Sequence, residues 1–281
     1  DIEIKVVCDV KEFLHELNIS ITKGLSIKNS IDSRWIDYCK QVRSRYPVVV
    51  DEYRSQNGRV SGFYFIEELC KLLNKDDVIV PESSGGAGEI TYQAFKIKRG
   101  QKMKNAAGLG SMGFGLPYSI GACLANDKRR TILINGDGAF QLNIQELETL
   151  HRLNLPVKIF IWNNNGYASI RAMQNNNFNG NYVASNEKSG LSMPDLRYIA
   201  NAYGINTFTI NNNNEIDEVL LKVLNSDGPV LCDVMVREDE TAKPRVKAIK
   251  LENGDMASSL LENMWPFLDE EEINRILNFK I

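Results

Sequence analysis

The stretch TILINGDGAFQLNIQELETLHRLNLPVKIFIWNNNGY, residues 131–167, decides the fold that we expect for this chain. Residues 131–134 are an apolar run with β-branched side chains, which is typical of a buried strand. From Phe140 to Leu153 apolar residues recur at spacings of three and four, which predicts one face of an amphipathic helix. Residues 157–162 predict a second buried strand. A Gly-Asp-Gly loop follows the first strand, and an asparagine-rich loop follows the second.

These two loops are expected to lie at the same edge of one sheet. A strand, a covering helix and a second strand in so few residues make a right-handed crossover with parallel strands. Both loops then follow the carboxyl ends of strands, which is where open α/β sheets bind ligands. Asp137 and Asn164, which lie 27 positions apart in the sequence, should therefore face each other.

The chemistry of the two loops indicates a site for a metal ion and a phosphate group. The first loop opens a helix, whose free N–H groups favour an anion, and its glycines let the backbone approach a ligand closely. A carboxylate and an amide oxygen beside phosphate oxygens are the ligands that Mg²⁺ prefers. A plain strand-helix-strand unit with a glycine turn would explain the elements, but not the positions of Asp137 and Asn164.

A known family combines these features. The Gly-Asp-Gly motif, with an Asn-Asn-x-Gly loop whose second Asn lies 27 positions after the Asp, resembles the cofactor motif of thiamine diphosphate enzymes. The intervening residues look most like the acetolactate synthase large-subunit group. The resemblance implies an α/β fold with a doubly wound parallel sheet flanked by helices. The alternation of predicted helices and strands between residues 61 and 236 agrees with such a sheet.

The resemblance also implies which residues contact the metal and the diphosphate. Asp137, Asn164 and the Gly166 carbonyl are expected to hold Mg²⁺. The N–H groups of Gly138 and Ala139 are expected to bind the diphosphate. Further backbone contacts are expected at Tyr167 and Ala168.

Two glycine-rich segments earlier in the chain complete the implied cofactor site. Ser83, Ser84 and Gly85, in a loop over residues 81–88, are expected to reach the diphosphate, although a flexible turn would also explain this loop. By the resemblance, the Gly110 carbonyl accepts from the 4′-amino group of the cofactor. Met112, 25 positions before Asp137, props the cofactor into a bent shape, with filling of the core as the alternative.

The segment GLGSMG at residues 108–113 also fits the dinucleotide-binding pattern G-x-G-x-x-G. That interpretation needs an apolar strand immediately before the motif. Residues 102–107, KMKNAA, are not such a strand. We therefore exclude dinucleotide binding at this segment.

The implied function is the thiamine diphosphate- and Mg²⁺-binding portion of a 2-oxo acid decarboxylating carboligase, with pyruvate as donor. The chain departs from the synthase group in two places. Asn165-Gly166-Tyr167-Ala168 replaces Gln-His-Leu-Gly, and Met173 replaces a Trp that favours 2-oxobutyrate as acceptor. A simple 2-oxo acid decarboxylase and a non-catalytic cofactor-binding or assembly module therefore remain open.

The family's activating Glu belongs to a pyrimidine-binding domain, which this chain does not resemble anywhere. The resemblance implies that the same or a second subunit supplies it, in a homodimer or homotetramer. It leaves open whether the full-length parent binds FAD. The catalytic residue itself is therefore unknown from this sequence.

The resemblance predicts four segments. Residues 1–20, with a strand at 2–7 and a helix from Val10, look like the end of a truncated middle domain, and the start Asp-Ile-Glu indicates a piece of a longer protein. Residues 21–60 form a linker helix region, residues 61–236 the diphosphate- and Mg²⁺-binding domain, and residues 237–281 a C-terminal tail. The tail is expected to be irregular and then helical, and either folds over the site or docks on the surface.

Composition excludes several classes of protein. The apolar fraction of 43% and the charged fraction of 25% are those of a soluble globular protein. The net charge of −3 and the lack of a long apolar run argue against nucleic acid or a membrane as partner. Five scattered cysteines without a C-x-x-C motif predict core or reduced thiols, a cytoplasmic location and no zinc site.

Overall fold

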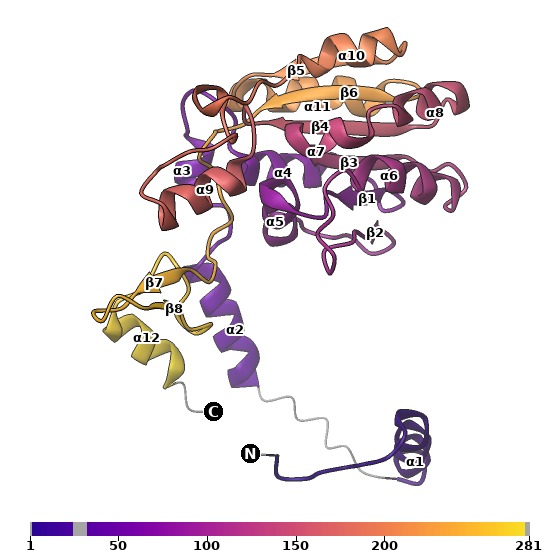
Figure 1. Ribbon diagram of the computed structural model, residues 1–281. Coiled ribbons are helices and arrows are strands. Elements are labelled where there is room, and N and C mark those ends of the chain that lie inside the picture. The colour runs from indigo at the N-terminus through magenta and orange to yellow at the C-terminus, as the bar shows by residue number, and fades with distance from the viewer. Residues whose placement is uncertain (1, 25–32, 279–281) are drawn as a thin grey trace. The chain divides into compact units, whose positions relative to one another are not determined.

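Six parallel strands form one sheet in the order β2-β1-β3-β4-β6-β5 (Figure 1). The strands are β1 (Val78–Pro81), β2 (Lys102–Met103), β3 (Thr131–Gly136), β4 (Val157–Asn163), β5 (Asn206–Ile210) and β6 (Val230–Met235). The chain runs outward from β1 to β2 and then returns to β3 on the other side of β1. This reversal confirms the doubly wound α/β fold and creates a crevice at the carboxyl ends of β1 and β3.

The sheet belongs to the larger of two units. The computed structural model describes residues 2–24 and 33–278, which divide into one unit of residues 48–274 and one of residues 1–47 with 275–281. The sheet and the candidate site lie wholly within the first unit.

Helices cover both faces of the sheet. One apolar core lies under α4 (Gly62–Leu72), α5 (Gly85–Ala94) and α11 (Ile216–Asn225), and the other under α6 (Gly115–Leu124), α8 (Glu146–Leu153) and α10 (Leu196–Ala202). Along β4, Phe160 and Trp162 belong to the first core, whereas Ile159 and Ile161 belong to the second. This alternation follows from the two-residue period of a strand, and it explains why a strand buried on both faces is apolar throughout.

The helix expected after β3 is present but broken. It begins at the acidic residue itself as α7 (Asp137–Phe140), continues as the 3₁₀ turn η1 (Gln141–Asn143), and resumes as α8. Phe140, Leu147 and Leu150 of the predicted apolar face are fully buried. The tighter 3₁₀ turn lets the apolar side chains on both sides of the break face the sheet.

One local expectation was wrong, and two features of the structure were not expected. Residues 81–88 are not an extended loop, because α5 begins at Gly85 and leaves only residues 82–84 between strand and helix. Lys102 and Met103 form β2, which pairs with β1 at the edge of the sheet. β2 is only two residues long and no helix follows it directly, so the segment after it still lacks the context of a dinucleotide motif. Ser61 precedes α4, but its side chain makes no capping bond.

The smaller unit contains α1 (Val10–Thr22), which is capped by Asp9, and α2 (Ser33–Arg45). The Tyr38 hydroxyl donates to the Ile276 carbonyl of α12 (Glu270–Leu277) at 2.7 Å. The strand expected at residues 2–7 is not formed, because a strand needs a neighbour for its backbone groups and none of the described residues pairs with it. The start of the expected linker, residues 25–32, lies outside the described residues, as does Asp1.

The tail is more regular than expected. β7 (Ala248–Lys250) and β8 (Met256–Ser258) form an antiparallel pair before α12. The turn between them holds Asn253, whose side chain bonds to Asp255. The remaining elements are α3 (Asp51–Arg54), α9 (Ala168–Asn177) and the 3₁₀ turns η2 (Glu187–Ser189) and η3 (Asn213–Glu215).

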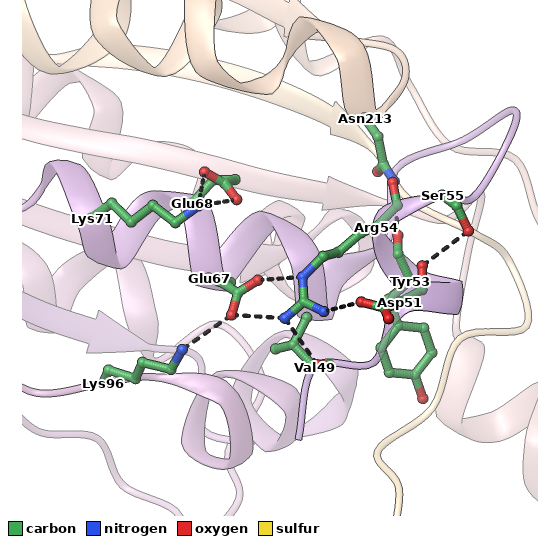
Figure 2. Close-up of polar contacts among 10 residues, drawn as sticks. All are labelled: Val49, Asp51, Tyr53, Arg54, Ser55, Glu67, Glu68, Lys71, Lys96 and Asn213. Atoms are coloured by element: carbon green, nitrogen blue, oxygen red, sulfur yellow. Dashed lines mark hydrogen bonds and ion pairs between the residues drawn. The ribbon is translucent and has the colours of Figure 1, made fainter. Parts of the chain in front are cut away.

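Arg54 fastens the segment before α4 onto that helix (Figure 2). Its guanidinium donates to Glu67 at 2.9 and 3.2 Å and to Asp51 at 2.6 Å, while Lys96 donates to the same Glu67 at 3.0 Å. Burial would raise the pKa of Glu67, but hydrogen bonds from Arg54 and Lys96 hold it below its ordinary value. On the other side, the Asn213 amide donates to the Tyr53 carbonyl at 2.8 Å.

Three of the five cysteines lie in the apolar cores. Cys70, Cys123 and Cys232 are buried in the cores, as expected, whereas Cys8 and Cys39 are exposed. Among the described residues, no helix has the length and apolar composition that crossing a membrane requires.

Candidate functional site

A cavity of about 290 Å³ lies at the carboxyl edge of the sheet, and we call it the strand-end cavity. Its wall comes from the segments that follow β1, β3, β4 and β6, together with the loop before α6. The parallel topology brings these segments together, because parallel strands place all their carboxyl ends at one edge.

Asp137 is the buried acid of this cavity, with only 2% of its surface exposed. Its Oδ1 accepts from the Gly138 N–H at 2.9 Å and its Oδ2 from the Gly166 N–H at 3.0 Å. Burial raises the pKa of Asp137 to about 6, against the effect of these two N–H groups. The carboxylate makes no ion pair with the described residues, and each oxygen keeps a free lone pair. A cation bound here would therefore find an unshared buried charge.

Arg171 of α9 holds the second loop in shape. Its Nη2 donates to the Asn164 carbonyl at 2.8 Å and to the Asn164 side-chain oxygen at 3.2 Å. The same guanidinium donates to the carbonyls of Ser185 at 3.0 Å and Glu238 at 2.7 Å. Burial depresses the pKa of Arg171, but a guanidinium keeps its charge. One buried cation thus fixes the loop after β4, a later loop and the exit of β6.

Two glycines are required by close contacts around the two loops. A Cβ added to Gly138 would overlap the ring of Tyr167. Gly166 has φ +135°, and a Cβ there would lie 2.6 Å from the Ser185 carbonyl oxygen and 2.9 Å from Arg171. The backbone of Gly166 is one that only glycine adopts freely, and both positions leave no room for a side chain.

Comparison with known proteins identifies the family. Residues 84–234 match the family described as thiamine pyrophosphate enzyme, C-terminal TPP binding domain. The chain belongs to this family of thiamine pyrophosphate enzymes.

Named relatives of this thiamine pyrophosphate enzyme chain are acetolactate synthases. It is 30% identical over 248 residues to acetolactate synthase 1, chloroplastic, of Zea mays, and this alignment covers 86% of the chain and 38% of the relative. It is 39% identical over 244 residues to the acetolactate synthase large subunit of Porphyra purpurea, which covers 87% of the chain and 40% of the relative. The chain therefore spans about two fifths of the length of these relatives.

The residues expected to bind the cofactor of a thiamine pyrophosphate enzyme meet at one place. All of them except Ser83 line the strand-end cavity: Ser84, Gly85, Gly110, Met112, Asp137, Gly138, Ala139, Asn164, Gly166, Tyr167 and Ala168. Ser83 is buried behind the wall, and its hydroxyl has no partner among the described residues. Met112 is 41% exposed, so it does not fill the core. Met173 does not line the cavity.

Sequence reasoning missed two buried charged residues beside this cofactor site. Arg171 is the single charged residue of α9, but no local pattern shows that it points inward. Glu82 is fully buried after β1, where its carboxylate accepts from the Ser83 N–H at 3.0 Å and the Gly115 N–H at 3.1 Å. Burial raises the pKa of Glu82. This carboxylate joins the loop after β1 to the start of α6.

Glu240 explains the missing cap of α4. Its carboxylate accepts from the Ser61 hydroxyl at 2.9 Å and from the Gly62 N–H at 2.6 Å. It also lines the strand-end cavity. Arg237 of the same tail lines this cavity as well, whereas none of the described residues after Glu240 does.

The donor set fits Mg²⁺ and a diphosphate. Asp137, Asn164 and the Gly166 carbonyl offer only oxygen ligands, which are those that Mg²⁺ takes. A Cβ added to Gly136 would meet nothing within 4 Å, so the backbone before Asp137 faces open space. A bound cation would compensate the buried charge of the Asp137 carboxylate.

Proposed function

We propose that this chain is the diphosphate- and Mg²⁺-binding portion of a 2-oxo acid decarboxylating carboligase that resembles acetolactate synthase, with pyruvate as donor. The observation that carries the proposal is the buried Asp137 carboxylate, which has no ion-pair partner among the described residues and faces the same cavity as Asn164 and Gly166. Membership of the thiamine pyrophosphate family and the names of the relatives support the reaction class.

Within this proposal, each group of the wall has one task. Asp137, Asn164 and the Gly166 carbonyl hold Mg²⁺, and the N–H groups of Gly138 and Ala139 face the diphosphate. Arg171 orients Asn164, and Met112 supports the shape of the bound cofactor. When bound, thiamine diphosphate supplies a carbon nucleophile that lets a 2-oxo acid lose CO₂ and its remainder join a second carbonyl.

The activating Glu and the pyrimidine-binding surface come, in this proposal, from outside these 281 residues, in the same or a second subunit. A homodimer or homotetramer would bring the halves together. The chain alone is then expected to show no full turnover of pyruvate. A cytoplasmic location belongs to the same proposal, although the Zea mays relatives are named chloroplastic.

Calorimetric titration with thiamine diphosphate, with and without Mg²⁺, tests the proposal. We expect Mg²⁺-dependent binding. Asp137→Asn should weaken it about 30-fold, or about 2 kcal/mol, because the side chain that binds the metal loses its charge. The matched control is Asp227→Asn, at an exposed acid before β6 and away from the cavity, which should bind as the unchanged chain does.

Unchanged affinity in Asp137→Asn would remove this residue from the metal site. If the unchanged chain does not bind, the same titration on the full-length parent separates two causes. Binding by the parent that Asp137→Asn weakens would mean that the pyrimidine half is needed. No binding by the parent would contradict the proposal.

A simple decarboxylase is the second candidate, because the residues after Asn164 depart from the synthase group. Product analysis of the full-length parent with pyruvate, with and without an added aldehyde or ketone acceptor, distinguishes the two. A carbon–carbon bonded product indicates the carboligase, and release of aldehyde alone indicates the decarboxylase.

A further inference from the structure

Three basic side chains of the tail gather on one aromatic ring. The Lys243 Nζ, the Arg245 Cζ and the Lys247 Nζ lie 5.3, 5.9 and 5.0 Å from the centroid of Trp265. Arg245 and Trp265 pair as an antiparallel bridge, with two backbone hydrogen bonds of 2.9 Å. Arg245 and Lys247 lie two residues apart, so in extended chain their stems reach the same side, and Lys243 reaches the ring from a bend just before them. The ring therefore holds three like charges close together.

These three side chains make no ion pair with the described residues. None of the ion pairs within residues 2–24 and 33–278 involves Lys243, Arg245 or Lys247, and the Arg245 Nε is buried without a hydrogen-bond partner. Cation–π contacts offset part of the repulsion, by about 0.5–1 kcal/mol each at such sites. Cations that make no ion pair with the described residues attract an anion, and they hold it best where water is partly excluded.

A cavity of about 490 Å³ adjoins this cluster, and we call it the tail cavity. Arg245, Lys247 and Trp265 line one part of it, and Asn175 and Asn176 of α9 line another. Its volume suits a ligand of nucleotide or sugar phosphate size. A guanidinium, an ammonium and two amides are donors that match phosphate oxygens and sugar hydroxyls.

Two acids also line the tail cavity, but both are already engaged. Asp239 accepts from Arg237 at 3.0 and 2.8 Å. Glu238 accepts from Asn165 at 2.8 Å and lies 3.6 Å from Arg59. The charge of Lys243 also helps to lower the pKa of Asp239, so we assign the ligand to Arg245 and Lys247, which make no ion pair with the described residues.

The tail cavity and the strand-end cavity share a wall residue. Ala168, at the start of α9, lines both. Ala172, Asn175 and Asn176 follow on the same face of α9 and line the tail cavity. From Ala168 to Asn176 the helix rises about 12 Å, at about 1.5 Å per residue. A ligand that follows this face of α9 would extend from the tail cavity to the mouth of the strand-end cavity.

We propose that the tail cavity binds the phosphate ester group of the acceptor substrate, while the acceptor's carbonyl lies in the adjoining strand-end cavity. The acceptor role rests on the proposed function. Binding of the phosphate ester does not, because it depends only on Arg245, Lys247 and the wall of α9.

The test is calorimetric titration of the chain with inorganic phosphate, glucose 6-phosphate and uridine diphosphate glucose. Saturating thiamine diphosphate and Mg²⁺ fill the strand-end cavity first. We expect at least one ester to bind, and the double variant Arg245→Gln with Lys247→Gln should weaken it tenfold or more. The matched control is Lys188→Gln, an exposed lysine near the tail cavity that does not line it. A preference between the two esters distinguishes a sugar phosphate from a nucleotide.

Several outcomes would overturn the inference. These are no binding of any probe, binding that survives the double variant, or displacement of the ester by thiamine diphosphate. If the double variant unfolds, each single variant is expected to weaken binding by about threefold or more, and two unchanged single variants would also overturn it. Ester binding at Arg245 without any Mg²⁺-dependent cofactor binding in the full-length parent would contradict the proposed function alone, and would leave an anion site without an acceptor role.

Discussion

The two edges of the same parallel sheet differ in the partners of their buried charged side chains. At the carboxyl edge, Asp137 is buried without a cation partner among the described residues. At the amino edge, Arg130 donates to both oxygens of Asp77 at 2.8 and 2.6 Å. There too, the Nζ of the buried Lys158 donates to the Ser226 carbonyl, and to a second carbonyl, that of Gly228, at 2.7 Å.

This difference separates structural charges from functional ones. A buried charge costs free energy unless a partner or a ligand compensates it. At the amino edge Asp77 and Arg130 pair with each other and two carbonyls accept from Lys158, so we infer that those charges serve the fold. At the carboxyl edge we expect a bound ligand to supply the counter-charge for Asp137. Changes at the amino edge should therefore lower stability without affecting cofactor binding, and changes at the carboxyl edge should mainly affect binding.

The largest effect is expected from Asp77→Asn. It leaves the Arg130 guanidinium without its ion pair, and the free energy of unfolding should fall by about 3 kcal/mol. Denaturant unfolding measures it, and cofactor affinity should not change. The control is Glu218→Gln, which removes an exposed pair with Lys222 and should leave the free energy of unfolding nearly unchanged. Equal losses in both variants would contradict the structural role of the amino edge.

Next in size is a pH effect at Lys158. Burial lowers the pKa of Lys158 to about 8, below its ordinary value of about 10.4. Between these pH values the unfolded chain binds more protons than the folded chain. Stability should therefore rise with pH across this window, by at most about 3 kcal/mol.

Chemical denaturation at several pH values measures this rise. In Lys158→Met the group that titrates is absent, so the curve of stability against pH should be flatter between pH 8 and 10 than in the unchanged chain. The prediction fails if both proteins show the same slope.

Gly138→Ala is the test at the carboxyl edge. The added methyl group would overlap the ring of Tyr167, and displacing that ring should cost about 2 kcal/mol of stability and weaken cofactor binding. Gly121→Ala is the control, because a Cβ there meets nothing within 4 Å on an exposed part of α6. Partial recovery on adding Tyr167→Ala would assign the loss to this contact, and normal binding by Gly138→Ala would refute it.

The smallest effect is expected from Arg171→Lys. A lysine keeps the charge but cannot hold several carbonyls with one planar group, so Asn164 loses its fixed orientation. Mg²⁺-dependent cofactor binding should weaken about tenfold, or about 1.4 kcal/mol. Arg197→Lys, at a half-exposed ion pair on α10, is the control. An equal change in both variants would show that Arg171 has no special role.

Much of the fold and of the strand-end cavity was predictable because its determinants are local. The apolar period of the stretch around Asp137 predicted the strands and the helix, and parallel crossover geometry then brought Asp137 and Asn164 to one edge. Boundaries were harder to predict. The break at η1 and the early start of α5 depend on packing against the sheet, which no short pattern encodes.

Glu82, Arg171 and the tail cations were not predictable for a related reason. A lone Glu after a strand or a lone Arg in a helix is usually solvated, and only the folded chain shows Arg171 turned toward the Asn164 loop. The gathering of Arg245 and Lys247 on Trp265 joins segments about twenty residues apart through an irregular tail. Their partners are set by tertiary contacts.

The sequence by itself determined the sheet, its direction and the oxygen-bearing groups at its carboxyl edge, because hydrophobic period and loop residues act over short distances. The tertiary structure alone decided which buried charges are paired and which are left for a ligand. The energy of a buried charge depends on every group around it in space, and those groups come from distant parts of the chain.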